Sequence, residues 1–599
     1  MNFDKRTIFA VILIGLVLVF VQTEFYQDRF MPPPPELPEQ STPLAQESRE
    51  QTGGISEGLR TTESTLIQPA EPAEPAQEEE MGSFVSLVGD GNAIMIETPL
   101  YFATLSSKGA TIHSWRLKAY DDPNDEPVQL VGQPAEGNLA LLLPVDLDTI
   151  DTSPFVFSYD KSAIRVEGNE AQESITFTLN LGNDRIIRKT YTFYPDKYSV
   201  DLRVELLNFN GYLVGFSYYL TWRSGMPSTE PDLKTDMESA QGYVYQGDSE
   251  TFNISDEPET ELFDNTIDWV GIRTKYFATA VIPTSAKGQS VLFHGTPVDL
   301  GQKVPLRKYG FELKMPFDQK ARRIDDFTVF LGPLDYEIVK SYNVDLEEMV
   351  DLGWSVFKPF GKFILWSFKL LHGVIPNYGF VIIVFSILIK LLLYPLTKKS
   401  YQSMKEMQAL QPVIQELKEK YKDDSQKQQQ ETMKLYKEYG INPLGGCIPM
   451  VLQMPLLIAL FQIFQSTIEL RGASFIFWIT DLSRPDTVAT LPFTIPLYGD
   501  TVNILPLFMG VTMFIQQKIS MKDPKQKALV YFMPIFFTLM FNSFPSGLNL
   551  YYSLFNLFSI LQEKLVPHST RTLDDLKKKS NGKPKQRRRV KHDYRGRKY

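Results

Sequence analysis

Residues 381–398 read VIIVFSILIKLLLYPLTK, an apolar run long enough to cross a bilayer, and it contains Lys390. Lys390 lies about three residues past the middle of the run, roughly 4.5 Å along a helix axis. A charge this deep in hydrocarbon costs about 3 kcal/mol. Two interpretations are open. The side chain extends toward the cytoplasmic interface near Lys398, or it lines a wet cavity inside the protein.

Further apolar runs follow the first one. They predict four more spans, at about 446–466, 501–517, 528–543 and 547–563. Residues 1–26 carry Lys5 and Arg6 ahead of another apolar run, which predicts an uncleaved N-terminal anchor. We therefore predict a polytopic α-helical membrane protein with six transmembrane helices.

Basic residues indicate the orientation of these spans. The connection 398–441 carries nine lysines, the connection 518–527 carries four, and the segment from residue 564 carries 14 lysines and arginines. These basic segments alternate with connections that are poor in lysine and arginine. The positive-inside rule therefore predicts that both termini lie in the cytoplasm.

Uncharged polar residues recur inside the predicted spans. Ser386 lies one helical turn before Lys390 and projects from the same face. Other spans contribute Gln453, Gln462, Gln517, Asn549, Tyr551, Tyr552 and Asn556. These groups are also typical of helix-to-helix hydrogen bonds. We expect no Asp or Glu in the five later spans, so water or an acidic ligand is the predicted partner of Lys390.

The chain between the anchor and residue 350 has a different composition and hydrophobic pattern. Residues 27–82 combine proline with acidic residues and predict a disordered linker. Residues 83–345 show strand-like alternation, as in Ile175, Phe177 and Leu179, and predict a large all-β domain with a sandwich architecture. This domain is expected on the far side of the membrane from both termini.

Three amphipathic or basic segments complete the predicted organisation. Residues 350–373 mix aromatic residues with lysines, which predicts a helix along the membrane interface; packing on the β domain is the alternative. Residues 398–441 predict a cytoplasmic helical hairpin with a stripe that includes Met404, Met407 and Leu410. The stripe is either a packing face or a flexible docking surface. The tail 566–599 is basic and suits anionic lipid or RNA.

Sequence signatures for chemistry are absent. The chain has one cysteine, Cys447, and five histidines, and it contains no phosphate-binding loop, metal-ligand cluster or nucleophile elbow. We therefore expect no enzymatic activity, no cofactor and no metal. An ion-coupled transporter is the main rival function, although no acidic relay residue or inverted repeat supports it. A glycan-binding role of the β domain is a second alternative.

Four ordered motifs resemble the membrane core of the YidC-type membrane protein insertases. They are LLLYPLTKKSYQSMKEMQALQPVIQ (391–415), YGINPLGGCIPMVLQMPLLIALF (439–461), ELRGASFIFWITDLSRPD (469–486) and FPSGLNLYYSLFNL (544–557). The similarity covers roughly residues 350–565. The anchor, linker and β domain resemble the Gram-negative bacterial form of the family, in which the β domain is a periplasmic β-supersandwich.

The resemblance implies a hydrophilic groove that is formed by five core helices in residues 374–565 and opens to the cytoplasm. The family's groove cation aligns with Lys390, and the family usually has arginine there, so bidentate recognition of carboxylates is lost. Other implied groove residues are Ser386, Cys447, Gln453, Gln517, Tyr551 and Tyr552. The family's Trp before FPSG is Ser543 here, so that contact is not carried over.

The resemblance also implies a function and its partners. The protein is expected to insert and help fold membrane proteins in the bacterial inner membrane, alone or with the Sec translocon, and without nucleotide hydrolysis. Nascent membrane proteins are the expected clients. The basic tail and the hairpin are expected to contact the ribosome, and membrane lipids complete the expected partners.

Overall fold

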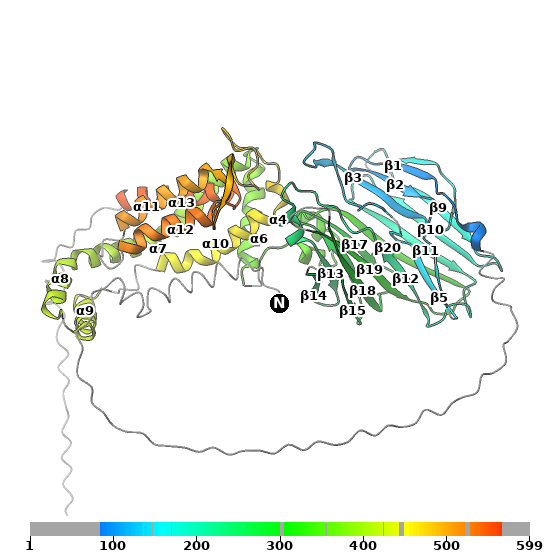
Figure 1. Cartoon of the computed structure of the whole chain (residues 1–599), viewed down its shortest axis with the longest axis horizontal. Coiled ribbons are helices and arrows are strands. Elements are labelled where there is room, and N and C mark those ends of the chain that lie inside the picture. Colours follow the sequence, from blue (N-terminus) through cyan, green and yellow to red (C-terminus); the bar gives the residue numbers. More distant parts are fainter. Residues whose placement is uncertain are drawn as a thin grey trace, which may run out of the picture.

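The structure consists of a β lobe and a helical lobe that lie side by side (Figure 1). This computed structural model describes residues 84–565 apart from 136, 147, 169–170, 256, 300–304, 354–355, 423, 442–447 and 521–526. The predicted anchor, linker and basic tail lie outside the described residues.

In the described part of the chain, three sheets build the β lobe, and their strands pair antiparallel except for β1 and β8, which pair parallel. The five-stranded sheet has the order β4 (Pro127–Gln129), β3 (Thr111–Asp121), β2 (Tyr101–Ser106), β1 (Ala93–Glu97) and β8 (Ala163–Arg165). The six-stranded sheet has the order β15 (Glu259–Phe263), β18 (Ser290–Val298), β19 (Leu306–Pro316), β12 (Ser217–Trp222), β5 (Leu141–Val145) and β6 (Asp148–Asp151). The nine-stranded sheet has the order β14 (Ser249–Phe252), β13 (Gln241–Tyr245), β16 (Trp269–Arg273), β17 (Phe277–Pro283), β20 (Arg322–Pro333), β11 (Ser199–Leu207), β10 (Ile186–Phe193), β9 (Glu173–Asn180) and β7 (Ser158–Tyr159).

Alternation along the strands places the core between the sheets. Ile175, Phe177 and Leu179 of β9 are buried, as their spacing predicts. The nine-stranded and six-stranded sheets face each other, because the hydroxyl of Tyr218 on β12 donates to Asp325 on β20 over 2.8 Å. The prediction of a mostly β domain is therefore confirmed. A short helix, α4 (Leu233–Ser239), lies between β12 and β13, and a second, α5 (Tyr336–Lys340), follows the last strand of the lobe, β20. Short 3-10 turns occur at η1 (Phe84–Leu87) and η2 (Leu346–Met349).

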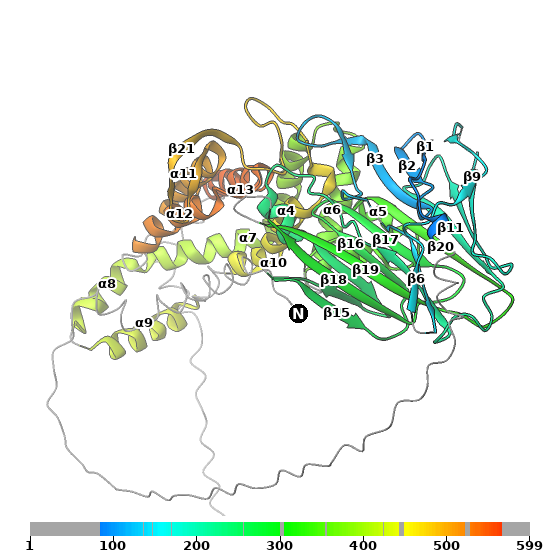
Figure 2. The ribbon, with the colours of Figure 1, turned by 45° about the vertical axis from the view of Figure 1, so that its right-hand side comes forward.

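Eight helices form the described part of the second lobe. They are α6 (Lys358–His372), α7 (Tyr378–Ala409), α8 (Gln411–Lys420), α9 (Ser425–Tyr439), α10 (Ile448–Ser466), α11 (Ile504–Ser520), α12 (Lys527–Phe541) and α13 (Ser546–Leu565). A short turn, η4 (Ile468–Leu470), follows α10, and a hairpin of β21 (Thr487–Ile495) and β22 (Gly499–Asn503) precedes α11. Helices α8 and α9 lie at the end of this lobe that is away from the β lobe (Figure 2).

Two predicted boundaries are corrected by the structure. Helix α7 continues through Pro395 to Ala409, so the predicted span and the first part of the predicted hairpin 398–441 are one helix. Helix α11 begins at Ile504 rather than near 501, because β22 extends to Asn503. Among the described helices, α7 alone is long and apolar enough to cross a membrane by length and composition, and Val530–Phe541 is a shorter apolar segment. The number of spans therefore stays a prediction.

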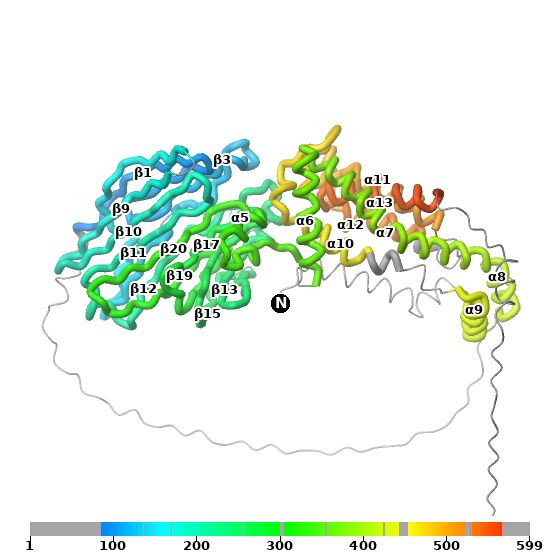
Figure 3. The backbone as a smooth tube through the Cα atoms, turned by 180° about the vertical axis from the view of Figure 1, so that it is seen from behind, coloured from blue at the N-terminus to red at the C-terminus, as the bar shows by residue number. Residues whose placement is uncertain are grey.

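Helix α6 lies across the helical lobe on the side of the β lobe (Figure 3). One face of the helix is buried, with Ile364, Leu365 and Phe368, whereas the aromatic side chains of Phe363 and Trp366 are exposed. Phe368 packs edge-on against Phe385 of α7 and Phe464 of α10. The helix therefore packs on the bundle. Its position along a membrane interface remains a prediction.

Candidate functional site

Helix α7 carries the candidate cation into the bundle. Asn377 caps the helix N-terminus, since its side-chain oxygen accepts from the backbone N–H groups of Gly379 and Phe380 at 2.9 and 3.3 Å. From this fixed start α7 packs against α6, α10 and α13, and α13 packs in turn against α11. Lys390 lies on the α7 face turned toward α13, where its side chain reaches Phe555 and Ser559.

Lys390 is buried between helices rather than extended toward lipid. Its side chain is 8% exposed, and its Nζ donates to Ser559 Oγ over 2.5 Å. The same ammonium lies 4.0 Å from the centre of the Phe555 ring, a cation–π arrangement. Among the described residues, no carboxylate lies within ion-pair distance of it. This burial argues against the interpretation that the side chain extends toward the interface.

The predicted hydroxyl residues Ser386, Tyr551 and Tyr552 lie on the same two helices as this site and form no hydrogen bond to Lys390. Ser386 is fully buried, and its Oγ donates to the carbonyl of Ile382 on its own helix over 2.7 Å. Tyr551 and Tyr552 on α13 are buried, and their hydroxyls have no hydrogen-bond partner in the described part of the chain. Tyr551 packs its ring against Phe385, the α7 residue next to Ser386. The structure therefore brings the α7 and α13 candidates together.

The predicted amide and thiol residues have no described contact with Lys390. Gln453 on α10 is half-buried, and Gln517 near the end of α11 is half-buried with its Oε1 unpaired among the described residues. Cys447 lies outside the described residues. No contact places Gln453 or Gln517 against Lys390, so their assignment to one groove stays a prediction.

Two polar residues of α13 were not predicted. Ser559 is the hydrogen-bond partner of Lys390, and Glu563 is 7% exposed and accepts from Ser520 Oγ on α11 over 2.7 Å. The expectation that the later spans lack acidic residues was wrong, because Glu563 belongs to α13. The signal was present in the sequence. Asn549, Ser553, Asn556, Ser559 and Glu563 recur at spacings of three and four, which places them on one helix face.

The structure places two residues of the predicted methionine stripe at one small core. Leu410 is fully buried and forms this core with Ile414 and Ile441, and the half-buried Met407 packs against it, which favours the packing interpretation for both residues. Met404 lies on the last turns of α7 and is half-buried. Their contact with clients or partners stays a prediction.

An apolar cavity of about 340 Å³ lies beside α7, on a face that does not include Lys390. It is lined by Pro359, Phe360 and Phe363 of α6, by Ile389, Leu392 and Leu393 of α7, and by Leu456 of α10. In the part of the chain that the structure describes, no group of three His, Cys, Asp or Glu side chains is placed to hold a metal ion. The chemistry available at the site is therefore that of a buried cation with hydroxyl neighbours.

Comparison with known proteins gives matches in both lobes. The family model described as the YidC periplasmic domain matches residues 93–367, and the model described as the 60Kd inner membrane protein matches residues 370–572. The membrane protein insertase YidC of Chlorobium phaeovibrioides is 36% identical over 592 residues, which are 95% of this chain and 96% of that protein. That of Chlorobaculum tepidum is 39% identical over 517 residues, 84% of this chain and 87% of that protein. An active YidC insertase crystal structure with its first transmembrane domain resolved covers 80% of this chain and 95% of its own, at 17% identity and a TM-score of 0.33.

Proposed function

Because this chain belongs to the YidC family of membrane protein insertases, we propose that it passes polar segments of nascent membrane proteins into the inner membrane beside Lys390. The observation that carries this proposal is the buried ammonium of Lys390, whose described neighbours are a hydroxyl and an aromatic ring. A buried charge without a counter-ion is costly, so an incoming carboxylate would be stabilised there. The site therefore suits clients with short acidic polar segments.

The proposed path shortens the hydrocarbon distance that a polar segment must cross. A client carboxylate replaces Ser559 as the partner of Lys390, and the polar stripe of α13 offers it further hydrogen bonds. The client's own apolar helix then moves into lipid, where burial of about twenty apolar residues supplies the driving force. A membrane potential adds about 2.3 kcal/mol per 100 mV for each negative charge that moves outward. No step requires nucleotide hydrolysis.

The proposal includes an orientation and partners. We place the β lobe in the periplasm and helices α8 and α9 in the cytoplasm, in line with the basic residues counted above. The nascent chain then meets Met404 and Met407 before it reaches Lys390. The ribosome, reached through the basic tail and the hairpin, the Sec translocon and membrane lipids are further proposed partners.

Site-specific crosslinking tests the proposed path. A photoreactive residue is placed at position 386, 390, 453 or 552 in the full chain, and a ribosome-stalled client with an acidic segment is offered to membranes. We expect crosslinks from 386, 390 and 552, and reduced client insertion when Lys390→Glu is introduced. The matched control is Lys398→Glu, which reverses a half-buried charge two turns further along α7. The proposal would be rejected if Lys390→Glu and Lys398→Glu inserted the client equally well and no position gave a crosslink to it.

A further inference from the structure

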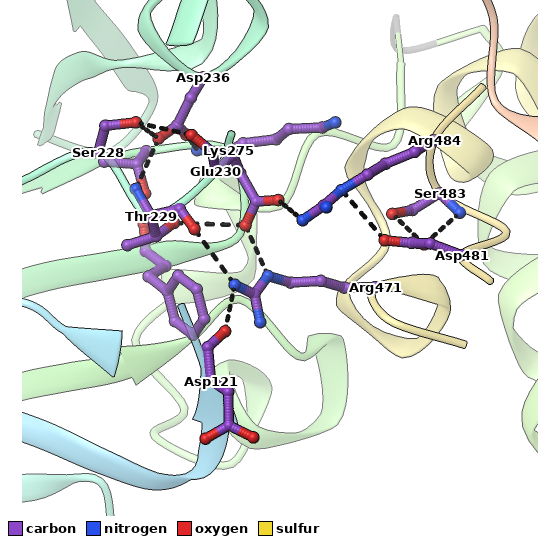
Figure 4. A network of polar contacts seen from close by, with 12 residues as sticks. Asp121, Ser228, Thr229, Glu230, Asp236, Lys275, Arg471, Asp481, Ser483 and Arg484 are labelled. Carbon is purple, nitrogen blue, oxygen red and sulfur yellow. Dashed lines mark hydrogen bonds and ion pairs between the residues drawn. The ribbon is translucent and has the colours of Figure 1, made fainter. Parts of the chain in front are cut away.

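The β lobe and the helical lobe meet at a cluster of charges centred on the buried Glu230 (Figure 4). Arg471 donates through Nε to Glu230 Oε1 over 2.6 Å, and Arg484 donates through Nη2 to Glu230 Oε2 over 3.1 Å. The side chains of Arg471 and Glu230 are 8% and 4% exposed. Glu230 belongs to the β lobe, whereas both arginines belong to the connection that follows α10. One carboxylate of the β lobe thus holds two points of that connection.

The segment that carries Glu230 is held in place by hydrogen bonds within the β lobe. It follows Thr229, whose backbone N–H donates to the carboxylate of the fully buried Asp236 over 2.9 Å. Ser228 donates to the same carboxylate oxygen, and the backbone N–H of Lys275 donates to the other oxygen over 3.1 Å. Through Asp236, these bonds tie the segment before α4 and the turn after β16 to α4. Glu230 is therefore presented from a rigid part of the β lobe.

Arg471 adds backbone contacts with the β lobe. Its Nη2 donates to the carbonyls of Asp121 and Thr229 at 2.8 and 3.2 Å, and its guanidinium lies 5.4 Å from the centre of the Phe277 ring. A guanidinium with three acceptors and an aromatic neighbour is well satisfied in a buried position. Loss of Glu230 would leave the buried Arg471 without its carboxylate partner, which is the costly way to break a buried pair, whereas the partly exposed Arg484 keeps its ion pair with Asp481.

The connection that Glu230 holds also covers the ends of the helices. We name residues 468–486 the cap segment. Its Asp486 accepts through Oδ2 from the backbone N–H groups of Ile504 and Leu505, at the start of α11. Its carbonyls at Leu482 and Arg484 accept from the start of α13, from Gly547 and Ser546 respectively.

The start of α7 is tied to the same segment. Asn377, the N-cap residue of α7, donates to the carbonyl of Ser474 over 2.9 Å. The cap segment continues from α10 through η4, so it contacts the β-lobe ends of four helices. The β lobe and the bundle ends are therefore joined through one short connection.

We propose that Glu230 is a positioning residue, by which the β lobe holds the cap segment 468–486 closed over the ends of α7, α10, α11 and α13. The β lobe then acts as a brace for the closed end of the bundle. This inference does not rest on the groove beside Lys390, and its test uses no client. It assigns the β lobe a mechanical role that requires neither catalysis nor glycan binding.

Thiol labelling tests the brace in the purified full chain. Cys447→Ser removes the natural thiol, and Ser483→Cys places a reporter of nearly the same size at a cap-segment position that is 2% exposed. The rate of maleimide labelling is compared between this parent and the parent with Glu230→Ala, and the unfolding temperature is measured alongside. Loss of a buried charged partner favours local opening, so we expect labelling about tenfold faster or more with Glu230→Ala. The main unfolding transition of the β lobe should move little.

Two further variants keep the test decisive. Glu261→Ala removes an exposed carboxylate of β15 and should leave the labelling rate unchanged. Arg484→Gln removes the ion pairs of Arg484 with Glu230 and with Asp481 but leaves the buried Arg471–Glu230 pair, so it should raise the rate less than Glu230→Ala. It replaces Glu230→Ala as the test variant if Glu230→Ala does not fold. Equal labelling rates in the parent and in the folded junction variant would overturn the proposal, as would an equal increase with Glu261→Ala.

Discussion

Lys390 of α7 donates a hydrogen bond to Ser559 of α13 over 2.5 Å, between residues 169 positions apart in the chain. The contact fixes the ammonium inside the bundle, next to the ring of Phe555. A hydroxyl stabilises a cation less than a carboxylate does, so Ser559 is a partner that an acidic client segment can replace. The relationship explains how a charge is held in the bundle and still remains available.

Charge is the property of Lys390 that the proposed function needs. Lys390→Met keeps the apolar stem and removes the ammonium, whereas Lys390→Arg keeps the charge and restores the family's usual residue. We expect Lys390→Met to lower insertion of a client with an acidic polar segment by about tenfold, since a charge interaction of this kind is worth about 1.4 kcal/mol or more. Lys390→Arg should insert normally. Protease protection of the client in membrane vesicles measures the effect, and a client with a neutral segment is the control. Equal loss with both clients would contradict the prediction.

Ser559 is predicted to stabilise the resting protein through Lys390. Ser559→Ala leaves the buried ammonium without its hydroxyl acceptor, which should lower the free energy of unfolding by about 1–3 kcal/mol. Ser559→Thr keeps the hydroxyl and should be close to neutral. Thermal unfolding of the full chain in detergent gives the values. The double variant with Lys390→Met should lose less than the sum of the single variants, because both remove the same contact. Strict additivity would show that the two residues do not interact.

The sequence was a good guide where side-chain period decides the structure. Alternation predicted the buried face of β9, and the apolar run 381–398 predicted the central part of α7. Long-range contacts could not be predicted from the sequence, because neither spacing nor composition relates Ser559 to Lys390 or Glu230 to Arg471. The hairpin β21–β22 was also missed, although Leu491, Phe493 and Ile495 alternate with Pro492 and Thr494 in its first strand, Thr487–Ile495. The start of α11 depends on Asp486, which caps Ile504 from 18 residues away.

The buried Lys189 of β10 should make the stability of the β lobe depend on pH. It is fully buried and donates to the carbonyls of Leu139, Gly109 and Ala110 at 2.6, 2.8 and 3.3 Å. Burial lowers the pKa of Lys189 from 10.5 to about 7. Between these two values the unfolded chain binds a proton that the folded protein lacks, so the free energy of unfolding should rise with pH. One proton gives a slope of at most about 1.4 kcal/mol per pH unit. Below about pH 7 both states are protonated and the slope from this group disappears.

Fluorescence of the buried Trp115, Trp222 and Trp269 allows this slope to be measured in the full chain. Denaturant unfolding at pH 7, 8 and 9 should show rising stability for the parent and a flatter dependence for Lys189→Met. Lys234→Met, which changes an exposed lysine of α4, is the control and should keep the parent's slope. If Lys189→Met kept the full slope as well, another group would be responsible.

Gly510 is predicted to be required for close packing of α11 on α12. A Cβ at this position would lie 2.0 Å from Thr538 Oγ1, which donates to the carbonyl of Pro534 over 2.8 Å. Gly510→Ala gains about 1 kcal/mol of helix propensity, but overpacking of this kind costs about 1–3 kcal/mol. We therefore expect a net decrease in thermal stability. Gly373→Ala, at the end of α6, meets no atom closer than 3.5 Å and should be neutral or slightly stabilising. The double variant Gly510→Ala and Thr538→Ala removes the obstructing oxygen and should recover most of the loss. A Gly510→Ala protein as stable as the parent, or a double variant less stable than Gly510→Ala, would show that the two helices have room to separate.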